Sequence, residues 1–115
     1  MMGKVVVLVT CANAREAGRI ARTLVEERLA ACVNIPSATI VSVYRWKGKV
    51  ERAREVLLIV KTSTHHFAEL ERRVRQMHSY QTPEIIALPV AAGSRSYLAW
   101  LDESLDPART KRRKK

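Results

Sequence analysis

Apolar and polar residues follow two different periods along this chain, and each change of period marks a predicted element. An almost unbroken apolar run at residues 4–10 (KVVVLVT) predicts a central strand. Asn13 can then cap a helix, with Glu16 three residues later in the manner of a capping box. Apolar residues recur at helical spacing from residue 17 to residue 25, so this helix has one face for a sheet.

The middle of the chain predicts a long hairpin. Residues 38–46 alternate between apolar and polar, which is typical of a half-exposed strand. Lys47 and Gly48 form a candidate two-residue turn, because glycine readily adopts positive φ. The returning strand covers residues 49–62, with a mixed first half and an apolar second half. Such a hairpin projects beyond a small domain and is a natural place for contact between subunits.

Two more helices and one strand complete the pattern. Ser63 or Thr64 can cap a second helix whose apolar stripe runs from residue 67 to residue 77. A fourth strand follows at residues 84–90, and a last helix runs from Ser94 to about Leu105. The succession β-α-β-β-α-β with an added helix predicts an α+β fold, a ferredoxin-like sandwich with two helices on one face of an antiparallel sheet.

The composition fits one globular domain. The chain has 115 residues, of which 47% are hydrophobic, enough for a single core and too few for two ordinary domains. We therefore predict one domain over residues 1–106 and a basic, disordered tail over residues 107–115. No apolar stretch approaches the roughly 20 residues that cross a bilayer, so no membrane partner is expected.

Most of the net charge of +10 belongs to the tail. Residues 109–115 carry six positive charges and no acidic residue, which leaves +4 for residues 1–108. A short basic tail attracts nucleic acid weakly and without sequence preference, through counterion release. The alternative is a solvated terminus that aids solubility.

The first residues lead directly into the strand pattern and lack a small-residue cleavage site. The expected location is therefore the cytoplasm. Cys11 and Cys32 are expected to stay reduced there.

One face of the predicted sheet has no helices to cover it, so association with other copies is the economical solution. Tyr44, Trp46, Tyr97 and Trp100 are large amphipathic residues of the kind enriched at interfaces. The alternative for each is ordinary packing in the core.

Five segments together closely resemble the divalent-cation tolerance (CutA) family. They are VVVLVTC from Val5, LAACVN from Leu29, YRWKGK from Tyr44, HSYQTPEIIALP from His78 and YLAWL from Tyr97. The resemblance implies a ferredoxin-like fold assembled as a homotrimer and a role in the response to and tolerance of metal ions. It also implies binding of copper (Cu²⁺) or another divalent cation, with no cofactor required.

The resemblance associates metal contacts with His78 and Glu84, at opposite ends of one polar turn. A first-strand cysteine is also linked to metal in the family, in a version where it precedes the threonine; here Cys11 follows Thr10. Cys11 is therefore the third candidate ligand. From the residues alone, His78 can equally be a helix-end histidine favoured by the helix dipole, and Glu84 a salt-bridge partner of Lys61 or an arginine.

Motifs of catalysis are missing, because the four glycines never cluster into a phosphate loop and no nucleophile elbow is present. We expect no enzymatic activity, although Cys11 before a helix start leaves open a reactive thiol with a lowered pKa. A second function also stays open, a signalling or ligand-sensing trimer similar in architecture to the PII proteins. In it, Lys61 and Tyr80 would hold a small anionic metabolite between subunits.

Overall fold

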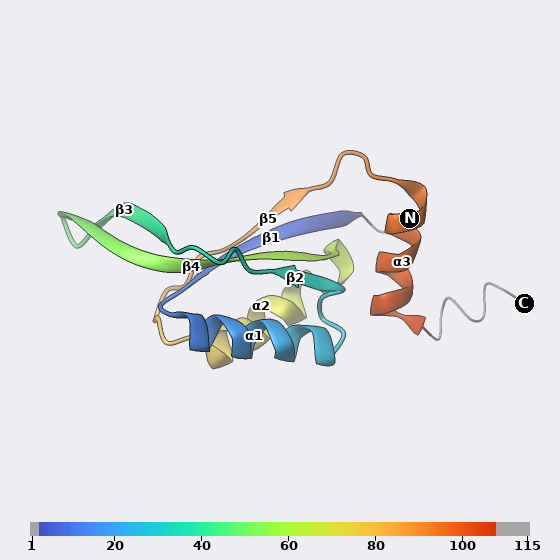
Figure 1. Cartoon of the computed structure of the whole chain (residues 1–115), viewed down its shortest axis with the longest axis horizontal. Coiled ribbons are helices and arrows are strands. Elements are labelled where there is room, and N and C mark those ends of the chain that lie inside the picture. Colours follow the sequence, from blue (N-terminus) through green and yellow to red (C-terminus); the bar gives the residue numbers. More distant parts are fainter. Residues whose placement is uncertain (1–2, 108–115) are drawn as a thin grey trace, which may run out of the picture.

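The computed structural model describes residues 3–107, in which one antiparallel sheet is packed against helices. The elements are β1 (Lys4–Cys11), α1 (Ala14–Glu26), β2 (Cys32–Asn34), β3 (Ile40–Trp46), β4 (Lys49–Ser63), a 3₁₀ turn (Thr64–His66), α2 (Phe67–Met77), β5 (Ile85–Pro89) and α3 (Arg95–Leu105). Helices α1 and α2 lie side by side under the sheet, and α3 lies at the end opposite the β3–β4 hairpin (Figure 1). The predicted α+β class is confirmed, and the predicted strands and helices are present in the predicted order, with one additional strand, β2.

The sheet has the order β2-β4-β1-β5, and β3 pairs with the first half of β4. Strand β1 pairs along its whole length with β4, from Lys4 opposite Ser63 to Cys11 opposite Val56. This position between β4 and β5 is the central one that its apolar run predicted.

The short strand β2 was not predicted. Cys32 pairs with Lys61 and Asn34 with Ile59, after which the chain leaves the sheet and returns to it as β3 at Ile40. Pro36 lies in the gap and cannot donate a ladder hydrogen bond, so one edge is divided into two strands.

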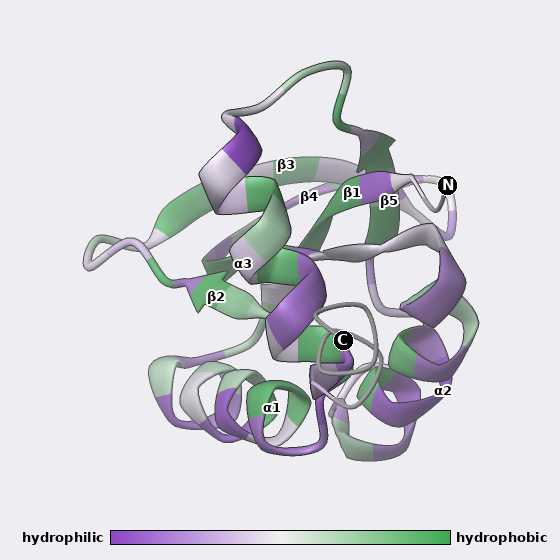
Figure 2. Ribbon diagram, turned by 90° about the vertical axis from the view of Figure 1, so that its right-hand side faces the viewer, coloured by the Kyte–Doolittle hydropathy of each residue, from purple (hydrophilic) through white to green (hydrophobic). Residues whose placement is uncertain are grey.

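The core lies between the sheet and the two helices. Alternate residues of β1 and β4 are buried against it, including Val7 and Leu58, and they meet Ile20 and Leu24 of α1 and Leu70 of α2. The hydrophobic positions of the helices turn toward the sheet, while hydrophilic positions face outward (Figure 2).

The opposite face of the sheet remains open within one chain. Ile86 and Leu88 of β5 are 49% and 48% exposed, and they lie beside Leu8 and Val6 of β1. Since side chains of paired residues share one face of a sheet, these residues form an apolar strip on the uncovered side.

Local signals explain most boundaries of the elements. Asn13 Oδ1 accepts a hydrogen bond of 2.8 Å from Glu16 N, as the capping pattern predicted. Lys47 and Gly48 have φ angles of 50° and 82°, the conformation of a tight hairpin turn. The predicted cap of the second helix differs: Ser63 makes no side-chain cap bond, because its hydroxyl lies 2.7 Å from Nδ1 of His66, and a 3₁₀ turn precedes α2.

No described helix is long and apolar enough to cross a membrane. The predicted basic tail lies outside the described residues from residue 108 onward, so its binding of nucleic acid stays a prediction.

Candidate functional site

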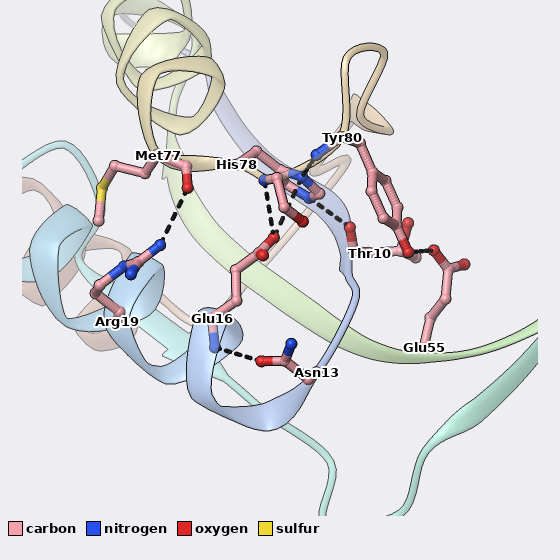
Figure 3. Close-up of polar contacts among 9 residues, drawn as sticks. Thr10, Asn13, Glu16, Arg19, Glu55, Met77, His78 and Tyr80 are labelled. Atoms are coloured by element: carbon pink, nitrogen blue, oxygen red, sulfur yellow. Dashed lines mark hydrogen bonds and ion pairs between the residues drawn. The ribbon is translucent and has the colours of Figure 1, made fainter.

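His78 ties the end of α2 to the end of β1. It leaves helical geometry at the C-cap, with φ −79° and ψ 142°, and its side chain is completely buried. Its Nε2 lies 2.7 Å from the carbonyl oxygen of Thr10, and Tyr80 N donates to Nδ1 at 3.1 Å (Figure 3). Because a carbonyl oxygen only accepts, Nε2 carries the proton in this arrangement and Nδ1 presents its lone pair.

Three buried groups converge at this point, from three different elements. They are the thiol of Cys11 on β1, the carboxylate of Glu16 on α1 and the imidazole of His78, whose ligand atoms all lie within 4.8 Å of one another. Glu16 Oε2 lies 3.3 Å from His78 Nδ1, and Ser79 N donates to the same oxygen at 3.4 Å. We call these residues the Cys11–Glu16–His78 cluster.

The cluster brings electron-rich atoms together. With the ring proton on Nε2, the Nδ1 lone pair and the Glu16 oxygen approach each other with no proton between them, an arrangement that a bound cation would stabilise. Sulfur, imidazole nitrogen and carboxylate oxygen are together a donor set for a divalent ion of intermediate softness, such as Cu²⁺ or Zn²⁺. The residues therefore fit a metal ion.

The thiol of Cys11 is protonated at neutral pH. Burial raises its pKa to about 12, and the negative charges of Glu16 and Glu55 act in the same direction. The alternative of a reactive thiol with a lowered pKa is therefore wrong, because the strand end is buried. Coordination by sulfur would release this proton.

A cleft of about 580 Å³ opens beside the cluster, between the β3–β4 hairpin and the polar turn after α2. Its hairpin side is formed by Ser42, Val43, Tyr44, Trp46 and Glu55. Its other side is formed by Thr10, Tyr80, Gln81, Thr82 and Glu84.

Glu55 and Tyr80 join the two sides of the cleft. The Tyr80 hydroxyl donates to Glu55 Oε2 at 2.8 Å, and the Ser42 hydroxyl donates to Oε1 at 2.6 Å. Burial and the hydrogen bond to Glu55 raise the pKa of the Tyr80 phenol far above its usual range. The Tyr80 ring also lies 4.8 Å from the imidazole of His78, so one residue touches both cluster and cleft.

Residues 5–104 match the family model described as CutA1 divalent ion tolerance protein. The chain belongs to the CutA1 family. The divalent-cation tolerance protein CutA of Thermus thermophilus is 55% identical over 100 residues, which cover 86% of this chain and 95% of the relative. The CutA protein of Archaeoglobus fulgidus is 45% identical over 100 residues, covering 87% and 96%.

Solved CutA structures have the same fold. The divalent cation tolerance protein of Thermus thermophilus superposes with a TM-score of 0.83 at 53% identity, covering 85% of this chain and 94% of that one. The protein of Archaeoglobus fulgidus gives 0.86 at 44% identity, covering 90% and 99%, and is named periplasmic. A relative from Arabidopsis thaliana is named chloroplastic, so the cytoplasmic location of this CutA chain stays a prediction.

The structure separates the two residues that the CutA resemblance linked to metal. His78 is in the cluster, whereas Glu84 is exposed, lies outside it and lines the cleft. A metal contact of Glu84 stays a prediction. Cys11 joins His78 although it follows Thr10, because the end of β1 lies beside the turn after α2.

Sequence reasoning missed Glu16, which it assigned only to helix capping. A signal was present, since Glu16 lies four residues before Ile20 and eight before Leu24, on the apolar face of α1. An acidic residue on a buried helix face requires polar surroundings, and here Ser79 N donates to the Glu16 carboxylate and the His78 ring lies 3.3 Å from it.

Of the remaining predicted residues, Tyr80 contacts the cluster through His78, and the others are not part of it. Lys61 is not among the described residues that line the cleft, so it and Tyr80 do not share that site. The four aromatic residues are 41–47% exposed, so the core alternative does not hold within one chain. Their interface role stays a prediction; they are Tyr44, Trp46, Tyr97 and Trp100.

Proposed function

We propose that this chain is a divalent-metal binding protein that acts in the response to and tolerance of metal ions, and that copper is one of the ions that it binds. The observation that carries the proposal is the convergence of Cys11, Glu16 and His78 within 4.8 Å inside the protein. The family description, divalent ion tolerance, supports the same function.

Each member of the cluster has a separate part in binding. Cys11 supplies sulfur after losing its proton, Glu16 supplies a carboxylate oxygen and compensates charge, and His78 supplies the Nδ1 lone pair. Because Tyr80 N also donates to Nδ1, binding there competes with that hydrogen bond. Occupancy of the cluster is thereby coupled to the position of Tyr80, which lines the cleft.

The test is calorimetric titration with Cu²⁺ and with Zn²⁺ in two buffers of different ionisation enthalpy. We expect one ion per chain, with about one proton released because the thiol ionises. Cys11→Ala and Glu16→Gln should each weaken binding at least about tenfold. Loss of one coordinating atom should cost about 1.4 kcal/mol of binding free energy or more, which corresponds to that factor. Equal affinity in parent and both variants would contradict the proposal.

Two controls make this titration specific. Glu103→Gln removes an exposed carboxylate of α3 and should leave affinity unchanged. Glu84→Gln tests the contact that the family resemblance implies. All proteins should carry His65→Gln, because an exposed imidazole binds copper weakly without forming a functional site.

The same proposal includes assembly of the ferredoxin-like unit as a homotrimer. The apolar strip at Ile86 and Leu88 and the exposed aromatic residues support it, because burying them requires another chain. Native mass spectrometry should give a mass of three chains, whereas a folded monomer at micromolar concentration would contradict it.

A second candidate function is the sensing of a small ligand in the cleft. The observation in its favour is a space of about 580 Å³, within the range of small-molecule sites. The test is ligand protection against heat in the presence of a metal chelator, since a ligand that binds only the folded state raises the melting temperature.

A further inference from the structure

We propose that the cleft binds a positively charged guanidinium or ammonium group, held by the carboxylates of Glu55 and Glu84 beside the aromatic rings of Tyr44 and Trp46. This inference rests on the second candidate function, ligand binding in the cleft, and names the chemical class of the ligand. It does not depend on the Cys11–Glu16–His78 cluster.

Glu55 is the main observation. It is 7% exposed and accepts hydrogen bonds from Ser42 and Tyr80, both of which are neutral donors. Within residues 3–107, no lysine, arginine or histidine forms an ion pair with it. A buried carboxylate without a positive partner is costly, and a cationic ligand would supply the missing charge.

The surroundings of Glu55 also carry negative charge and no compensating positive charge in the cleft lining. Its charge raises the pKa of the Cys11 thiol and of the Tyr80 phenol. Glu84 adds a second carboxylate at the exposed rim, and none of the ten described residues that line the cleft is lysine or arginine. This cleft is therefore unsuited to a small anionic ligand, whereas the site predicted for Lys61 and Tyr80 between subunits stays a prediction.

An organic cation fits this cleft better than a metal ion. Tyr44, Trp46 and Tyr80 line it, and aromatic rings attract guanidinium and ammonium groups through their negative faces. Both oxygens of Glu55 already accept a hydroxyl hydrogen bond, which leaves lone pairs for N–H donors rather than a bare carboxylate for close metal coordination. The volume also exceeds what a single ion needs.

The cationic group has two possible sources with the same chemistry. It can belong to a free small molecule, or to a lysine or arginine of a second copy, since the chain carries 21 such residues. The experiment below separates the two sources by following binding and assembly together.

The test uses n-butylguanidinium as the probe and n-butylurea as its neutral counterpart, with a chelator present to remove metal. Fluorescence of Trp46 reports on the cleft, in a Trp100→Phe background so that Trp46 is the remaining indole. We expect saturable quenching by the guanidinium probe in the millimolar range or tighter, and binding of the urea at least about tenfold weaker.

Variants assign the effect to the two carboxylates. Glu55→Gln should weaken the guanidinium probe at least about tenfold, and Glu84→Gln about two- to fivefold, because the rim is screened by solvent. Glu103→Gln is the matched control and should change nothing. If Glu55→Gln fails to fold, Glu84→Gln and the comparison of the two probes still decide the question.

The outcomes are distinguishable. Equal binding of the urea would overturn the cationic class but leave ligand binding in the cleft intact, and binding of neither probe would overturn both. Guanidinium binding with unchanged sedimentation supports a free small molecule. Guanidinium binding that dissociates the assembly supports a basic side chain of a second copy as the natural occupant.

Discussion

At the scale of single residues, His78 explains why three elements meet at one point. Both ring nitrogens have backbone partners, the carbonyl of Thr10 on one side and the amide of Tyr80 on the other. Arg19 adds a bond of 3.2 Å from α1 to the Met77 carbonyl, just before His78. The site is thus held by its own hydrogen bonds before any ligand arrives.

Replacement of His78 should therefore destabilise the protein without metal. We expect His78→Ala to lower the free energy of unfolding by about 2–4 kcal/mol, because the buried carbonyl of Thr10 and the partly buried amide of Tyr80 lose their partner. His65→Ala, at an exposed histidine, should change it by less than about 0.5 kcal/mol. Urea unfolding in a chelator would measure both, and similar values would show that His78 is not structural.

The raised pKa of Cys11 predicts a dependence of stability on pH. The pKa of the folded thiol is about 12, whereas the ordinary pKa of a cysteine is 9.0, so the thiol loses its proton first in the unfolded state. The protonated Cys11 thiol therefore stabilises the folded state fully below pH 9, and this contribution to the free energy of unfolding is lost as pH rises from about 9 to about 12.

Between pH 8 and pH 10, this loss should amount to about 1 kcal/mol in the parent protein and be absent in Cys11→Ala. Lysines and tyrosines titrate in both proteins, so the difference between the two slopes isolates Cys11. Parallel stability curves over this range would contradict the assignment.

At the scale of elements, the β3–β4 hairpin turn requires a glycine for its backbone conformation, whereas helix α1 contains a glycine that its backbone does not require. Gly48 has φ +82° in the hairpin turn, a conformation that residues with a Cβ adopt at a cost. Gly18 lies within α1 on its exposed side. A Cβ added at either position meets nothing within 4 Å, so the backbone alone distinguishes them.

Two alanine substitutions test this difference directly. Gly48→Ala should destabilise by about 1 kcal/mol, because of the positive φ. Gly18→Ala should stabilise by about 0.5–1 kcal/mol, because alanine is the better helix former. Thermal unfolding of the two variants beside the parent gives the comparison, and shifts of the same sign would show that the hairpin turn tolerates a side chain.

At the scale of the whole molecule, a single chain leaves one side of the sheet and the projecting hairpin uncovered. The principal extents are 57 × 26 × 25 Å, so the molecule is elongated, and the hairpin projects at one end of its long axis (Figure 1). Helix α3 is joined to the sheet by the ion pair of Lys4 with Asp102 at 3.1 Å and by packing of Leu101 on Ala31.

The proposed homotrimer predicts that charge on the open face blocks assembly. Ile86→Glu should dissociate the assembly, because an unpaired carboxylate would be buried at the interface. Val25→Glu is the matched control, since Val25 is also exposed and apolar, at 42%, but lies on α1. Sedimentation velocity should show a smaller species for Ile86→Glu alone, and a trimer in both variants would exclude this face as the interface.

The sequence could predict part of the site. The family motifs named Cys11 and His78 as candidates, and the structure brings both into one cluster. Glu16 was missed and Glu84 lies outside the cluster, because the distance between an acidic residue and a histidine depends on how α1 and the polar turn pack, which the spacing along the chain does not specify.

The sequence by itself determined the α+β class, the succession of strands and helices and the hairpin turn, because apolar periodicity and turn residues act locally. Only the tertiary structure decided that β2 separates from β3 and that Glu16 joins Cys11 and His78. It also decided that the cleft beside them is lined by Glu55 and Glu84 and by no described lysine or arginine. Those features arise where distant segments meet, since the pairing of β1 with β4 and the packing of α1 and α2 set distances that no local pattern specifies.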